Sequence, residues 1–88
     1  MKIEWVDGFE IKAAIESGEI VISANREGML SLAKQLTALA DGVPGDHIHY
    51  DEYNSLEEGS TEMIIVMCHG DGSNVIKIEI SFNSLYYR

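Results

Sequence analysis

Cysteine, proline and basic residues are scarce in this sequence of 88 residues. The one cysteine, Cys68, has no partner for an internal disulfide, and the first residues lack the charged and apolar regions of a signal peptide. The longest apolar run, Met63–Cys68, is much shorter than the roughly 20 residues that a membrane-spanning helix needs. We therefore expect a cytoplasmic protein without disulfides or membrane spans.

Positive charge is especially rare, with six basic residues against fifteen acidic ones and a net charge of −9. Nucleic acids and anionic membranes attract Lys and Arg, so we expect neither as a partner. No basic residue occurs between Lys34 and Lys77, whereas eight acidic residues do. Two interpretations stay open for this acidic stretch: an ordinary solvated surface, or recognition of a basic protein by electrostatic steering.

The residues that are present predict one folded domain over 1–88, because 45% of them are hydrophobic and the chain is too short for a second core. Alternating or β-branched runs predict strands at residues 2–6, 9–16, 19–23, 47–50, 61–68 and 74–82. Tight turns are expected at Asp7-Gly8 and at Ser17-Gly18. Together with one helix, these runs predict an α+β fold in which an amphipathic helix packs on a mainly antiparallel sheet of five to six strands.

The helix is predicted from about Arg26 to Asp41, with Asn25 as its N-cap and Gly42 in the left-handed conformation after its end. Apolar residues at 3- and 4-residue spacing would form its buried face: Met29, Leu32, Ala33, Leu36, Leu39 and Ala40. Ser31 and Gln35 lie largely off that face.

Two histidines and an aspartate share one face of the predicted strand at 47–50, since side chains two residues apart point the same way. His47, His49 and Asp51 could therefore hold a divalent metal, while Ile48 and Tyr50 would face the core. No fourth ligand is evident, and an exposed strand face explains the same pattern, so we expect no metal or other cofactor. Catalysis by a cysteine–histidine pair is also not expected, because the adjacent Cys68 and His69 would point to opposite faces.

The segment from Ala24 to Ile65 resembles the immunity protein 32 family of bacterial polymorphic toxin systems. The resemblance is carried by "NREG" at residues 25–28, "HIHYDEYNSLEEGS" at 47–60 and "E-x-I-I" at 62–65, and it covers about half of the chain. It implies a small cytoplasmic protein, not an enzyme, that neutralises a cognate toxin by stoichiometric binding. A basic toxin such as a nuclease would suit the acidic charge.

The surface expected to contact this partner combines acidic, aromatic and histidine side chains: His47, His49, Asp51, Glu52, Tyr53, Asn54, Leu56, Glu57, Glu58 and Glu62. Tyr53 is the preferred aromatic anchor, because Tyr50 is expected in the core. Two alternatives remain open: a small metal-binding or metal-dependent enzyme module that uses His47, His49 and Asp51, and an adaptor subunit whose acidic face binds an unrelated protein.

Overall fold

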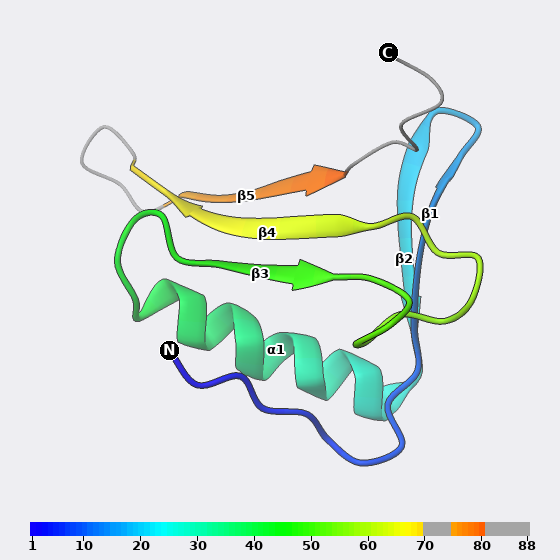
Figure 1. The fold of residues 1–88 in the computed structure, drawn as a ribbon, viewed down its shortest axis with the longest axis horizontal. Coiled ribbons are helices and arrows are strands. Elements are labelled where there is room, and N and C mark those ends of the chain that lie inside the picture. The colour runs from blue at the N-terminus through cyan, green and yellow to red at the C-terminus, as the bar shows by residue number, and fades with distance from the viewer. Residues whose placement is uncertain (70–74, 81–88) are drawn as a thin grey trace.

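The structure is a computed structural model that describes residues 1–69 and the backbone of residues 75–80. The elements follow in the order β1 (Ile11–Glu16), β2 (Glu19–Ala24), α1 (Arg26–Ala40), β3 (His47–Tyr50), β4 (Met63–Cys68) and β5 (Val75–Ile80) (Figure 1). All strand pairs are antiparallel. The α+β class is therefore confirmed. No helix in this part of the chain is long and apolar enough to cross a membrane.

The prediction of a single sheet is wrong, because the strands form a β1-β2 hairpin and a separate sheet of order β3-β4-β5. The hairpin stands at one end of the three-stranded sheet and runs across its strand direction (Figure 1). The outer edge of β1 is occupied by the loop between β3 and β4, since the Glu57 and Thr61 amides donate to the Ile11 and Ala13 carbonyls, each at 2.8 Å. Those carbonyls cannot pair with a further strand. Of the predicted strand at 74–82, residues 75–80 form β5 and the rest lie outside the described residues.

The β1-β2 hairpin confirms the turn predicted at Ser17-Gly18. Ser17 and Gly18 have φ values of 51° and 78°, the left-handed pair that a two-residue hairpin turn requires. Asp7 and Gly8 also form a turn, with φ of 84° at Gly8, but it joins no two strands.

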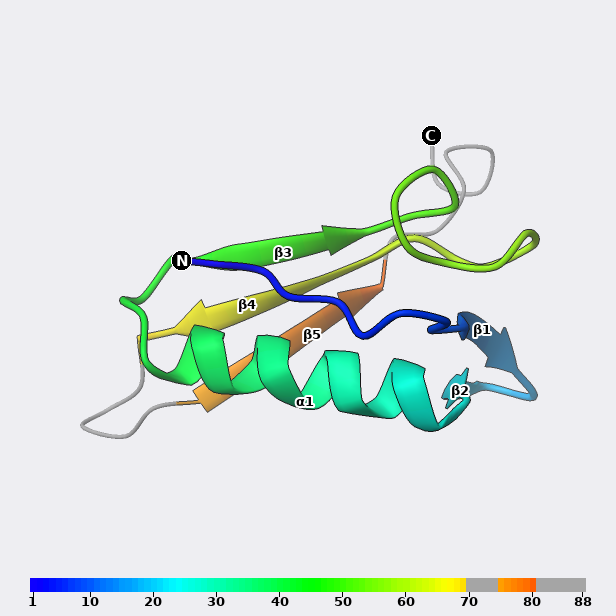
Figure 2. The same ribbon diagram turned by 90° about the horizontal axis from the view of Figure 1, so that it is seen from below.

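Residues 2–6 were predicted as a strand, and this is wrong. They run as an extended segment along α1, and helix side chains bind their backbone (Figure 2). The Val6 amide donates to Ser31 Oγ at 2.8 Å, and Gln35 Nε2 donates to the Glu4 carbonyl at 2.9 Å. Side chains of the helix thus bind backbone groups that a neighbouring strand would otherwise bind.

The helix begins at the predicted cap. Asn25 Oδ1 accepts from the Gly28 amide at 2.8 Å and from the Glu10 amide at 3.0 Å, so one side chain caps α1 and fixes the approach to β1. At the other end, Gly42 is not left-handed, contrary to the prediction. A Cβ at Gly42 would instead collide with the Asp46 carboxylate, which accepts from the Val43 amide at 3.0 Å.

The buried face of α1 differs from the predicted one. Gly28, Ser31, Gln35 and Leu39 are its buried residues, whereas Met29 is 50% exposed. Of the other predicted face residues, Leu32 and Leu36 are half-buried, and Ala33 and Ala40 are exposed. The helix is rotated because the N-terminal segment covers one of its flanks, so polar side chains that bind main-chain groups replace part of the expected apolar stripe.

The core lies between α1 and the three-stranded sheet and extends to the hairpin. It contains Ile11, Ala13, Leu39, Ile48, Tyr50, Leu56, Met63 and Ile65. Every second residue of β3 is buried, as predicted from its alternation, and the same burial pattern is found in β4. Tyr50 is only 1% exposed, so its expected position in the core is confirmed.

Candidate functional site

The loop from Asp51 to Glu62, here called the acidic loop, joins β3 to β4 and carries much of the predicted surface. Its first turn is built around Asp51. The Asp51 carboxylate accepts from the Tyr53 and Asn54 amides at 2.9 and 3.0 Å, and the Asp51 carbonyl accepts from the Leu56 amide at 2.8 Å. Aspartate suits this position because its short side chain can reach the amides two and three residues ahead.

The second half of the acidic loop is docked on β1. Besides the two backbone bonds from Glu57 and Thr61, the Ala13 amide donates to Ser60 Oγ at 3.2 Å. The Glu52 carboxylate accepts from the Gly59 amide at 2.5 Å and so joins the two halves of the loop. These hydrogen bonds join the two halves of the loop to each other and to β1. They fix the loop conformation before a partner binds, which lowers the entropy cost of binding.

Several side chains of the acidic loop point into solvent. Tyr53 is 95% exposed, and Glu57, Glu58 and Glu62 are exposed as well. Within the described residues, no Lys or Arg lies within ion-pair distance of these carboxylates; the ion pair found there joins Lys34 to Glu4. In the described part of the chain, the loop thus presents an exposed aromatic ring together with carboxylates that form no ion pair.

Other predicted contact residues have structural roles instead. Leu56 is 5% exposed and belongs to the core, so its side chain cannot contact a partner in this conformation. Asp51 and Asn54 form bonds inside the loop and to its stem; Asn54 Nδ2 donates to the His49 carbonyl at 3.3 Å. The outward set is therefore smaller than the predicted one.

His47 and His49 are brought together, but Asp51 does not join them as a ligand. Both histidines are exposed on the face of β3 opposite the core, with ring centroids 4.9 Å apart in an edge-to-face arrangement. His47 Nδ1 lies 2.9 Å from the Gly45 carbonyl. The Asp51 carboxylate is bound by the loop amides, and in the part of the chain that the structure describes no three His, Cys, Asp or Glu side chains could hold a metal ion together.

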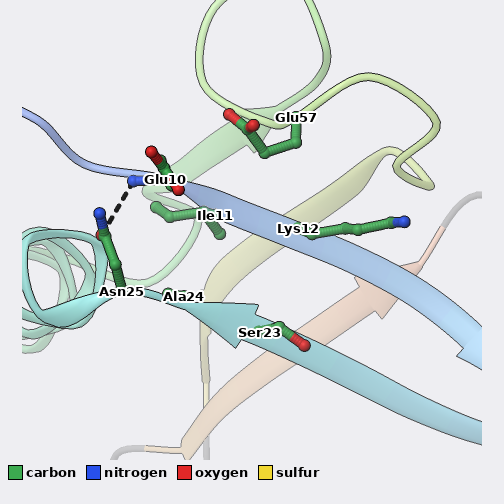
Figure 3. Close-up of a pocket in the computed structure, with 7 residues that line it drawn as sticks. All are labelled: Glu10, Ile11, Lys12, Ser23, Ala24, Asn25 and Glu57. Carbon is green, nitrogen blue, oxygen red and sulfur yellow. Dashed lines mark hydrogen bonds between the residues drawn. The ribbon is translucent and has the colours of Figure 1, made fainter.

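A pocket of about 250 Å³ lies where β1, β2 and the acidic loop meet (Figure 3). It is lined by Glu10, Ile11, Lys12, Ser23, Ala24, Asn25 and Glu57. The carboxylates of Glu10 and Glu57 lie on one rim, while Lys12 extends away from them (Figure 3). Glu10 was not predicted as a neighbour of the acidic loop, because residues 10 and 57 are far apart along the chain.

Comparison with known proteins gives one family. A sequence profile described as Immunity protein 32 matches residues 19–68, which is more than half of the chain. The matched region begins at β2 and ends with β4, so it includes α1, the two histidines and the whole acidic loop. No curated protein and no solved structure gives a significant match.

Proposed function

The chain belongs to the immunity protein 32 family, and we propose on this basis that it binds a cognate bacterial toxin through the acidic loop and so neutralises it. Family membership is the observation that carries the proposal. Immunity proteins generally act as inhibitors without catalysis, so function depends on a surface rather than on a reactive centre.

The acidic loop is the surface best suited to this role. Tyr53 offers a large, exposed ring in the first turn of a loop that internal hydrogen bonds hold in place, as an anchor residue requires. Glu57 and Glu58 lie close by on the same loop and are exposed. A partner with a basic surface would gain from both features: charge accelerates encounter, and burial of the ring slows dissociation.

A basic toxin is the partner that the charge favours. The chain carries a net charge of −9, and among the described residues no Lys or Arg lies within ion-pair distance of the loop carboxylates. Toxins that cleave nucleic acids need basic clefts for the phosphate backbone, and an acidic loop can occupy such a cleft. A nuclease is therefore the toxin class we propose.

The test is co-expression of the chain with the product of the neighbouring toxin gene, followed by binding kinetics. We expect growth to be rescued. Replacing Glu57 and Glu58 together by Lys should slow association and weaken its dependence on salt, because screening acts over about 10 Å at 0.1 M ionic strength. Tyr53→Ala should mainly speed dissociation, at a cost of about 2 kcal/mol or more for a hot-spot residue.

Matched controls distinguish the effect of the acidic loop on binding from the effect of the net charge of the protein. Glu16→Lys with Glu19→Lys makes the same change in net charge at the tip of the β1-β2 hairpin, where both residues are exposed. Tyr53→Phe keeps the ring and removes only the hydroxyl. If the hairpin pair slows association as much as the loop pair does, the acidic loop is not the contact surface. If wild-type protein neither binds the toxin nor rescues growth, the immunity function itself is refuted.

A further inference from the structure

The N-terminal segment Glu4–Val6, here called the strap, lies between α1 and β3 on the side of the sheet that faces the core (Figure 2). Its main chain is bound by two side chains of the helix. Ser31 Oγ accepts from the Val6 amide at 2.8 Å, and Gln35 Nε2 donates to the Glu4 carbonyl at 2.9 Å. The helix thus binds one donor and one acceptor of an extended backbone.

The surface of α1 and β3 beneath the strap, here called the groove, includes Ser31, Gln35 and Tyr50. Ser31 and Gln35 are fully buried, and buried polar side chains are costly unless they are paired. Tyr50 on β3 donates its hydroxyl to Gln35 Oε1 at 2.6 Å, which orients the amide with its nitrogen toward the strap. Burial raises the pKa of Tyr50 to about 12, so the phenol keeps this proton at neutral pH.

Two side chains of the strap, Trp5 and Val6, are partly buried, and Trp5 packs against the core. Trp5 stacks on Phe9 with a ring-centroid distance of 4.5 Å and meets the Tyr50 ring edge-on at 6.3 Å, yet it remains partly exposed. The ion pair between Glu4 and Lys34 is 3.9 Å long and more than half exposed, so it adds little. Residues 1–4 are all exposed.

We propose that the groove between α1 and β3 is a binding site for an extended peptide, and that its occupant, the chain's own strap, opens as a unit separate from the rest of the fold. Recognition rests on two main-chain hydrogen bonds and two partly buried side chains, those of Trp5 and Val6. Segments with so few buried contacts open locally at free energies below that of global unfolding. This inference does not depend on the acidic loop binding a toxin.

The chain provides a direct probe of the strap, because Trp5 is its only tryptophan. In a denaturant titration of the full chain, tryptophan fluorescence should change at a lower concentration than the far-ultraviolet circular dichroism signal. Ser31→Ala should lower the fluorescence midpoint further and leave the circular dichroism midpoint in place. Coincident transitions in wild type would overturn the proposal.

Thr37→Ala is the matched control for Ser31→Ala. Both hydroxyls donate to the carbonyl four residues earlier in the helix, Ser31 at 2.8 Å and Thr37 at 2.9 Å, but Thr37 is exposed and does not contact the strap. We expect Thr37→Ala to leave the fluorescence midpoint unchanged relative to the circular dichroism midpoint. An equal shift in both variants would attribute the effect to helix stability and would refute the strap as its cause.

A peptide added in trans tests the groove itself. Trp5→Ala protein contains no tryptophan, so the tryptophan of a peptide of residues 1–8 reports its own binding. We expect a saturable blue shift of its emission, and several-fold weaker binding when Ser31→Ala is added. A peptide that gives no shift, or a Trp5→Ala protein that is globally unfolded, would show that the strap is not a separable ligand of the groove.

Discussion

Gly28→Ala tests a close crossing between the first turn of α1 and the chain that enters β1. The chain enters β1 directly above the first turn of α1, and a Cβ at Gly28 would lie 2.5 Å from the Glu10 carbonyl oxygen and 2.9 Å from both Ala24 Cβ and Ile11 Cγ1. Two of these neighbours are a backbone atom and the Cβ of a short side chain, so neither can rotate away. Gly28 belongs to the "NREG" stretch, and its absent side chain explains why glycine suits that position.

Two opposing effects decide the result. Alanine is the better helix former and on its own would stabilise α1 by about 1 kcal/mol. Against this, the Glu10 carbonyl would have to retreat by about 1 Å to reach an ordinary contact distance. That movement would stretch its 3.1 Å bond from the Asn25 amide, worth about 0.5–1.5 kcal/mol, and crowding in a packed region costs about 1–3 kcal/mol. We therefore expect a net loss of about 1–3 kcal/mol.

Urea denaturation followed by circular dichroism measures this change, and a loss of 1 kcal/mol corresponds to a fall in Tm of roughly 4–8 °C for a domain of this size. Ala33→Gly is the control, because Ala33 lies on the exposed side of the same helix and reports the helix propensity alone. A Gly28→Ala protein that is more stable than wild type by the amount that Ala33→Gly loses would refute the close crossing.

Three further predictions concern the core, its buried phenol and the histidine pair. Leu39→Ala should cost about 2–5 kcal/mol in free energy of unfolding, whereas Met29→Ala should change it by less than about 0.5 kcal/mol, since Leu39 is fully buried and Met29 is half exposed. The pKa of Tyr50 is raised in the folded state to about 12 from the ordinary 10.0, so its contribution to stability should be complete below pH 10 and be lost as the pH rises toward 12. Stability curves measured over this range should be flatter for Tyr50→Phe, and equal slopes would contradict the assignment. Protein purified without a histidine tag and dialysed should contain well below one equivalent of metal; a stoichiometric metal that disappears in the double variant His47→Ala with His49→Ala would overturn this.

Local features of the fold could be predicted because each depends on a few adjacent residues. The Ser17-Gly18 turn follows from the left-handed conformation that this residue pair tolerates, and the helix start follows from the side-chain oxygen of Asn25. Alternation along β3 assigned Tyr50 to the core correctly. None of these predictions requires knowing which distant segment of the chain packs against the residues concerned.

The errors at the N-terminal segment and on α1 share one physical source, which is contact with the main chain of a distant segment. Ser31 and Gln35 were predicted to lie largely off the apolar face of the helix, yet they are buried, since they bind the backbone of the strap. Every residue type has a backbone carbonyl, and every type except proline has a backbone N–H. Such partners therefore do not depend on the residue type. Hydrophobic periodicity cannot register such partners, so it assigned the wrong flank of α1 to the core.

In the candidate site, too, exposure was predicted correctly from composition, whereas features that depend on long-range contacts were not predicted. The composition of the acidic loop pointed to exposed glutamates and to Tyr53, and these side chains do point into solvent. The burial of Leu56 and the use of the Asp51 carboxylate inside the loop were not predicted, because both depend on how the loop folds back on β1.

The support of the acidic loop lies partly outside the region that resembles known immunity proteins. The family profile begins at residue 19, whereas the two carbonyls that receive the loop amides belong to Ile11 and Ala13. Both residues are fully buried, so β1 fills the core and also fixes the loop. Because the loop contacts carbonyls rather than particular side chains, many sequences could serve as β1 provided that they bury small or apolar residues at these positions. A search for the determinants of loop conformation must therefore extend to the hairpin, where the requirement is for geometry and burial and not for residue identity.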